Sequence, residues 1–164
     1  MKRVFVLVIA LLGAGTASAE IAEKTPAKAC ALLADSGLKG RKWVNDYGDG
    51  SAGCASNYKD IGSSGSGLAN NIAYYVIGVN QYVMEVKLVL NYNQPSKAAP
   101  ATAALLSASQ KLSQRALGAP LPKSITDLIT QGESGSEKVG NGSVQVVRED
   151  WPTGKGYEVQ VMMQ

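Results

Sequence analysis

The chain of 164 residues contains no histidine, and this absence restricts its chemistry more than any other feature of its composition. Histidine is the commonest general base and the commonest neutral metal ligand in proteins. Catalytic sites of the Ser-His-Asp and Cys-His types are therefore excluded. We expect a protein that is not an enzyme, has no catalytic residues and binds no metal or other cofactor.

An apolar run long enough to span a bilayer is also missing, because a spanning helix needs about 20 such residues. Residues 1–19 instead have the three parts of a cleavable signal peptide, namely Lys2 and Arg3, the apolar run 4–12 and the small residues 17–19. Cleavage would leave Glu20, and not a lipid-bearing cysteine, at the new N-terminus. We expect a periplasmic or secreted protein that does not insert into the membrane after cleavage.

A strong excess of one charge is absent as well. The chain has 16 basic and 13 acidic residues, and loss of Lys2 and Arg3 with the signal peptide would leave 14 basic and 13 acidic ones. This near balance gives no electrostatic basis for binding a nucleic-acid backbone or an anionic membrane. We therefore expect neither nucleic acid nor membrane as a partner.

Cysteine is rare, since Cys30 and Cys54 are the two in the chain, and they are not spaced as Cys-x-x-Cys. In an exported protein such a pair is far more often a disulfide than a metal or redox site. We predict a disulfide between them, and such a bond stabilises a fold by about 3 kcal/mol on the chain-entropy model.

Residues 20–164 have the length of a single domain, and three of its segments predict helices. The first covers residues 26–36, where Thr25 can cap the helix, Pro26 suits its first position and Gly37 can end it. The second covers residues 101–117 and has an apolar stripe at helical spacing. The third follows Ser124 and ends at Gly132.

Two pairs of segments predict strands. Residues 71–79 and 82–92 form the first pair, joined by a tight turn around Asn80-Gln81, and the second segment alternates between two faces throughout. Residues 143–150 and 155–163 form the second pair, with the turn at 151–154. The order α-β-β-α-α-β-β predicts an α+β fold, a four-stranded, mainly antiparallel sheet with two or three helices on one face.

Residues 37–70 predict a long loop that the disulfide tethers, because they contain eight glycines and five serines and little periodicity. Aromatic side chains among small polar residues are typical of protein-binding surfaces. We therefore predict a partner-binding surface on this loop and on the turn at 150–155, made of Trp43, Tyr47, Asp49, Tyr58 and Trp151. The alternative, that these aromatic rings cover the edge of the core, stays open.

Other local motifs give weaker signals. Ser36 and Lys39 match the Ser-x-x-Lys pattern of some serine nucleophiles, but Gly37 between them favours a helix end. Residues 48–53 fit Gly-x-Gly-x-x-Gly without the strand and helix that a dinucleotide site requires. Asp46 and Asp49 are compatible with a weak calcium site, although a glutamate at the expected ligand position is missing.

These features together predict an exported, non-catalytic domain that binds a protein partner. A periplasmic inhibitor or immunity protein, which occludes an envelope-targeted toxin or hydrolase, fits this description because it needs shape and charge but no catalytic group. The alternative is a structural or accessory subunit of a cell-envelope or secretion assembly, in which an exposed strand edge pairs with a neighbour. The oligomeric state is left open.

Overall fold

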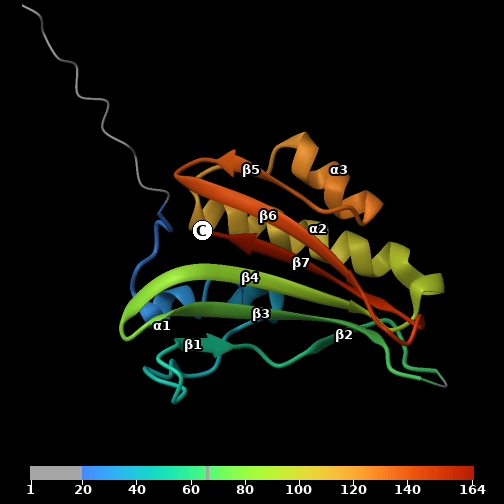
Figure 1. Cartoon of the computed structure of the whole chain (residues 1–164), viewed down its shortest axis with the longest axis horizontal. Coiled ribbons are helices and arrows are strands. Elements are labelled where there is room, and N and C mark those ends of the chain that lie inside the picture. Colours follow the sequence, from blue (N-terminus) through green and yellow to red (C-terminus); the bar gives the residue numbers. More distant parts are fainter. Residues whose placement is uncertain (1–19, 66) are drawn as a thin grey trace, which may run out of the picture.

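The computed structural model describes residues 20–65 and 67–164, so the predicted signal peptide lies outside the described residues. In this part of the chain, seven strands form one antiparallel sheet in the order β1-β3-β4-β7-β6-β5, and β2 pairs with β3 (Figure 1). The strands are β1 (Ala52–Ala55), β2 (Lys59–Ile61), β3 (Asn70–Val79), β4 (Tyr82–Tyr92), β5 (Gly135–Val139), β6 (Gly142–Asp150) and β7 (Tyr157–Met163).

The helices lie on one face of this sheet, as predicted (Figure 1). The long helix α2 packs across β3, β4 and β7, while α3 covers β5 and β6 and α1 lies against β4. The helical elements are α1 (Pro26–Ala29), α2 (Ala98–Ala116) and α3 (Lys123–Gln131), together with the 3-10 turns η1 (Ala34–Ser36) and η2 (Pro95–Lys97). The α+β class is therefore confirmed.

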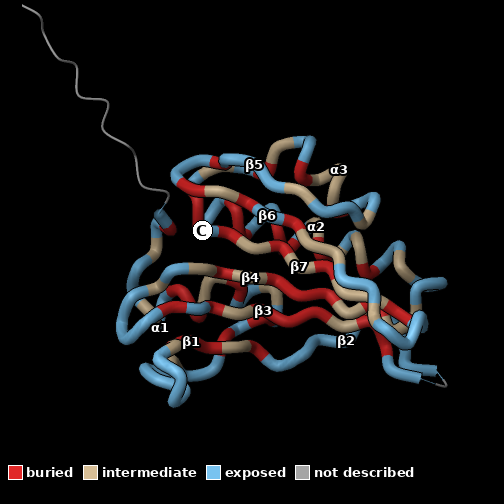
Figure 2. The backbone as a smooth tube through the Cα atoms, viewed as in Figure 1, coloured by how far each residue is buried: buried red, intermediate tan, exposed pale blue. Residues whose placement is uncertain are grey.

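The core lies between the helices and the sheet, and buried residues recur at largely alternating positions along the central strands (Figure 2). Tyr74, Leu88 and Val161 sit opposite one another on β3, β4 and β7 and are fully buried. Leu105 and Leu112 of α2 are buried against this face. Burying a side chain of this size stabilises the fold by about 1.5–3 kcal/mol, so the alternation in β4 is what fixes the sheet onto the helices.

The predicted sheet of four strands is too small. The four predicted segments are present as β3, β4, β6 and β7, but β1, β2 and β5 were not predicted as strands. β1 has the sequence Ala-Gly-Cys-Ala, which carries little intrinsic strand preference. It forms a strand because it pairs with β3, with Cys54 opposite Val76, a contact that no local pattern reveals. Within the predicted loop, Val44 also forms a single antiparallel bridge with Gly53 of β1.

The predicted first helix is too long. α1 ends at Ala29, and the chain then continues to Ser36 in tighter i-to-i+3 turns. Arg115 of α2 donates a hydrogen bond to the carbonyl oxygen of Leu32 and pairs with Asp35 through two hydrogen bonds of 2.8 and 2.9 Å. Because Arg115 takes the carbonyl that a continued helix would use, a tertiary contact replaces part of the local helix.

The chain then reverses at Gly37, whose φ of +73° lies in the left-handed region that glycine adopts readily. The predicted end of this segment is thus confirmed, although the helix before it is interrupted. The two other helices lie close to their predicted positions, and α2 begins three residues earlier than expected. Pro100 falls in its first turn, where the missing N–H costs nothing.

Candidate partner-binding surface

Exposed apolar side chains gather at the end of the β3–β4 hairpin. Eight large apolar side chains are exposed among the described residues, and six of them belong to this end of the sheet or to the loop beside it. Tyr82 and Met84 are the most exposed of these six, at 74% and 59% of their surface. We call the six residues the hairpin surface; they are Val44, Tyr47, Ile77, Val79, Tyr82 and Met84.

Strand register places most of the hairpin surface on the sheet face that the helices leave uncovered. Val79 is paired with Tyr82, and Ile77 lies two residues before Val79 and therefore on the same face. Gly53 is paired with both Ile77 and Val44, so Val44 also faces this way. The register passes from Val83 to Glu85 without a partner for Met84, which is the extra residue of a β-bulge.

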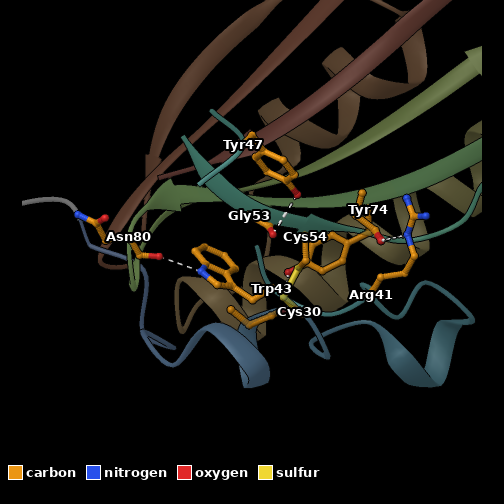
Figure 3. The surroundings of a disulfide bond; sticks show 10 residues. Cys30, Arg41, Trp43, Tyr47, Gly53, Cys54, Tyr74 and Asn80 are labelled. Atoms are coloured by element: carbon orange, nitrogen blue, oxygen red, sulfur yellow. Dashed lines mark hydrogen bonds between the residues drawn. A yellow bond between two sulfur atoms is a disulfide. The ribbon is translucent and has the colours of Figure 1, made fainter. Parts of the chain in front are cut away.

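Trp43 contacts the hairpin turn from the side of the sheet that the helices cover. The indole N–H of Trp43 donates a 2.8 Å hydrogen bond to the backbone carbonyl of Asn80 (Figure 3). The indole ring packs against Gly78, where a Cβ atom would lie 3.1 Å from the ring and 1.9 Å from the carbonyl oxygen of Tyr82. Trp43 is half-buried in this position, so it joins the loop to the hairpin instead of projecting into solvent.

The predicted disulfide between Cys30 and Cys54 is present and lies beneath the same loop (Figure 3). It links the segment after α1 to β1, and both cysteines are buried. Gly40 crosses directly over it, since a Cβ atom on Gly40 would lie 2.8 Å from Cys54 Sγ. The backbone N–H of Gly40 also donates a 2.7 Å hydrogen bond to the carbonyl of Cys30. The disulfide and these contacts fix residues 40–45 against the sheet.

The tip of the loop, residues 45–51, is organised by its own acidic side chains. Asp46 accepts hydrogen bonds from the backbone N–H groups of Gly48 and Gly50, and Asp49 accepts two from Ser51. The hydrogen bonds from the Ser51 hydroxyl and backbone N–H hold the pKa of Asp49 below its ordinary value. The Tyr47 hydroxyl donates to the carbonyl of Gly53 at 3.0 Å, which orients the exposed ring beside β1.

A groove lies on the helix side of the hairpin turn, next to the hairpin surface. It has a volume of about 800 Å³ and runs between the start of α1 and residues 39–45. Pro26, Ala27, Cys30 and Trp43 contribute to its apolar part, and Lys39, Arg41 and Lys42 contribute cations. We call this the basic groove. The side-chain amides of Asn45 and Gln81 are hydrogen-bonded to each other at its end near the turn.

The structure does not bring all five predicted partner-binding residues together. Trp43, Tyr47 and Asp49 lie at the hairpin end of the sheet. Tyr58, which is 58% exposed, lies further along the uncovered face, where its hydroxyl is 3.1 Å from that of Tyr75. Partial burial and this contact raise the pKa of Tyr75.

Trp151 lies at the opposite end of the sheet from Trp43. It belongs to the β6–β7 turn, its backbone N–H bonds the carbonyl of Gly156, and its ring packs against Gly156. β7 starts opposite the last residue of β4, whereas Trp43 contacts the turn that precedes β4. A single partner-binding surface made of the loop and this turn is therefore not formed.

Sequence reasoning missed Val79, Tyr82 and Met84, although a signal existed. The apolar side chains of both strands continue up to the two-residue turn, where solvated hairpins usually change to polar residues. It also overlooked that Lys39, Arg41 and Lys42 are three cations within four residues, directly before a tryptophan.

The Ser-x-x-Lys motif does not form a serine–lysine pair. The Ser36 hydroxyl accepts a 3.2 Å hydrogen bond from Lys111 of α2, and Lys39 contributes to the basic groove instead. Lys111 also lies 3.5 Å from the carboxylate of Asp35. An ammonium group paired with a carboxylate is poorly suited to accept a proton from serine.

Within the part of the chain that the structure describes, no helix is long and apolar enough to cross a membrane. The same residues contain no group of three or more cysteine, aspartate or glutamate side chains placed to hold a metal ion. No protein-family model, no curated protein and no solved structure matches this chain.

Proposed function

We propose that this protein is an exported, non-catalytic domain that binds a protein partner through the hairpin surface. The observation that carries the proposal is the concentration of exposed apolar side chains at one end of the sheet. Contiguous exposed apolar side chains on a soluble domain mark interaction sites more often than chance exposure does. Tyrosine and methionine are also enriched at the centres of interfaces.

The rigidity of this end supports the same function. The hairpin surface rests on paired strands, on Trp43 and on the disulfide, so little backbone conformational entropy remains to be lost on binding. Rigid surfaces of this kind suit a protein that occludes another protein's cleft. Within the proposed class we favour a periplasmic inhibitor or immunity protein against an envelope-targeted toxin or hydrolase.

Export is supported by the leader-like residues 1–19 and by the disulfide, which fits an oxidising compartment. A non-catalytic role is supported by the absence of histidine and by the use of both cysteines in the disulfide. Binding by shape and surface chemistry needs neither group.

The alternative, assembly through an exposed strand edge, receives less support from the sheet edges. The edge strand β5 carries Glu137 and Lys138, and charged side chains on an edge strand disfavour pairing with another chain. The other edge is formed by the short strands β1 and β2, and the Val44–Gly53 bridge covers part of β1. Neither edge offers a long, bare strand.

The proposal is tested with a double variant that makes the hairpin surface polar, Tyr82→Ser with Met84→Ser. A matched control, Tyr58→Ser with Leu68→Ser, removes equally exposed apolar side chains elsewhere, because Tyr58 and Leu68 are 58% and 73% exposed. Each protein is expressed in its native cells with a photo-crosslinking residue at position 79. Crosslinked partners are identified, and the complex is rebuilt from purified components and sized by light scattering.

The unmodified protein and the control should form a 1:1 complex with one envelope enzyme and reduce its activity, while the hairpin variant should lose both effects. Equal binding by the hairpin variant would contradict the proposal. Loss of binding in the control alone would place the interface near Tyr58 and would also overturn the assignment to the hairpin surface.

A further inference from the structure

The basic groove combines three cationic residues with an apolar wall and is adjacent to the hairpin surface. Lys39, Arg41 and Lys42 line it together with Pro26, Ala27 and Trp43. Among the described residues that line it, none is acidic. Its volume of about 800 Å³ lies within the range of about 300–1,000 Å³ that is usual for ligand sites.

The positive charge of this groove comes from its own lysine and arginine residues and not from the net charge of the protein. Residues 20–164 contain 14 basic and 13 acidic residues, so this part of the chain supplies almost no net charge. Five ion pairs join described residues, and none of them involves Lys39, Arg41 or Lys42. The charge of these side chains is therefore available to an incoming group.

Arg41 is the most constrained of the three cations. Its Nε atom lies 3.5 Å from the carbonyl oxygen of Ala55, and its side chain extends away from the disulfide (Figure 3). Lys39 and Lys42 are exposed and form no side-chain hydrogen bond among the described residues. These two lysines can follow an anionic ligand, whereas the side chain of Arg41 is directed toward β1.

The position of the groove indicates what kind of ligand it takes. Gln81 lines the groove, and its neighbour Tyr82 belongs to the hairpin surface, so the two regions lie on either side of one turn. Likewise, Trp43 lines the groove, and its neighbour Val44 belongs to the hairpin surface. A partner that covers the hairpin surface therefore brings its adjoining segment into the groove, where acidic and apolar side chains would find complementary groups.

We propose that the basic groove binds an extended acidic segment of the protein partner, with aspartate or glutamate facing Lys39 and Lys42 and an apolar side chain on Trp43. This assignment rests on the proposed function, since the segment belongs to the partner that the hairpin surface recognises. The groove supplies selectivity for a negatively charged partner, and the hairpin surface supplies most of the buried apolar area.

The test uses a blocked hexapeptide of two Asp-Glu-Leu repeats as the probe, with two Asn-Gln-Leu repeats as the neutral control peptide. Binding to residues 20–164 is followed by amide and Trp43 indole shifts in nuclear magnetic resonance spectra, which also show whether each variant is folded. The test variant is Lys39→Gln with Lys42→Gln. The control variant, Lys138→Gln with Lys155→Gln, removes the same charge from exposed lysines outside the groove.

The acidic peptide should shift residues 25–27, 39–45 and 81 in a saturable way, and the neutral peptide should not. The test variant should bind about tenfold more weakly, as expected for loss of two exposed charge pairs. The control variant should bind as the native protein does, and salt near 0.5 M should weaken binding further.

Three results would overturn the acidic-segment proposal: no shifts in the groove, equal binding of the neutral peptide, or an equal loss in the control variant. Tighter binding of a short single-stranded oligonucleotide to the same residues would also overturn it. None of these results depends on the hairpin surface. The partner complex and its loss on Tyr82→Ser with Met84→Ser therefore remain a separate measure of the proposed function.

Discussion

The indole N–H of Trp43 lies 2.8 Å from the backbone carbonyl of Asn80, so a residue of the glycine-rich loop holds the turn of a distant hairpin. Asn80 has a φ of +53°, in the left-handed region that asparagine tolerates better than most residues. The contact fixes the turn between the basic groove and the hairpin surface. Trp43 therefore helps to position both the basic groove and the hairpin surface.

Replacing Trp43 by phenylalanine should loosen this turn without unfolding the protein. Loss of one hydrogen bond of this kind costs about 1 kcal/mol of unfolding free energy, and amide exchange at Asn80, Gln81 and Tyr82 should accelerate. Urea unfolding and hydrogen-exchange measurements provide the two readouts. Trp151→Phe is the control, because Trp151 lies at the other end of the sheet. Unchanged exchange in Trp43→Phe would contradict this prediction.

Removing the disulfide should lower stability through the loop that it closes. The two cysteines are 24 residues apart, and Cys30→Ala with Cys54→Ala should cost about 3 kcal/mol of unfolding free energy. Denaturant unfolding measures this difference. Adding a reductant should destabilise the native protein by a similar amount and leave the double variant unchanged; coincident curves for native and variant protein would show that the bond adds no stability.

A methyl group at position 40 should collide with the disulfide. The Cβ atom of Gly40→Ala would lie 2.8 Å from Cys54 Sγ and 3.0 Å from the carbonyl oxygen of Cys30. Such crowding costs about 1–3 kcal/mol, measured as a shift of the urea midpoint. Gly67→Ala is the matched control, since no atom lies within 4 Å of its Cβ position. Equal stability of the two variants would argue against close packing over the disulfide.

Acid should weaken the contact between the segment after α1 and α2. Hydrogen bonds from Arg115, with the nearby charge of Lys111, hold the pKa of Asp35 well below its ordinary value. A lowered pKa in the folded state means that the stabilisation is present above the unfolded pKa of about 4 and is lost as the pH falls below it. Asp35→Asn should therefore lower the thermal midpoint at neutral pH and have a smaller effect near pH 2.

This effect should be small, because Asp35 is exposed to solvent and salt screens the pair. Thermal unfolding of both proteins across this pH range, at low and high salt, measures it. Glu133→Gln is the control, since Glu133 is exposed and forms no ion pair among the described residues. A difference between native and Asp35→Asn protein that grows toward low pH would contradict the assigned role of Arg115.

The sequence predicts those parts of the fold in which local pattern and burial agree. The alternation in residues 82–92, the turn at Asn80-Gln81 and the stops at Gly37 and Gly132 all correspond to the structure. The disulfide followed from the number of cysteines and the expected compartment. The α+β class could be predicted because the correctly predicted helices and strands make up most of the secondary structure.

The missed parts depend on contacts between distant residues. β1 and β2 form strands because they pair with β3. β5 is polar and forms a strand because it pairs with β6. The helix predicted to reach Ser36 is interrupted by Arg115, which lies 79 residues further along the chain. No local window contains both members of these pairs.

The candidate site could be predicted only in part, because some of its residues come together through contacts between distant segments. Composition pointed to the loop that holds Trp43, Tyr47 and Asp49. Tyr47 belongs to the hairpin surface, and the other two residues lie beside it. The exposure of Tyr82 and Met84 depends on which sheet face the helices cover, and Trp151 could be separated from the loop only once the strand order was known.

Residues 39–45, which form one wall of the basic groove, lie in sequence between the two cysteines. The disulfide therefore closes the stretch of chain that contains this wall, and reduction of the bond would remove a covalent constraint from the wall and not from strands β3 to β7.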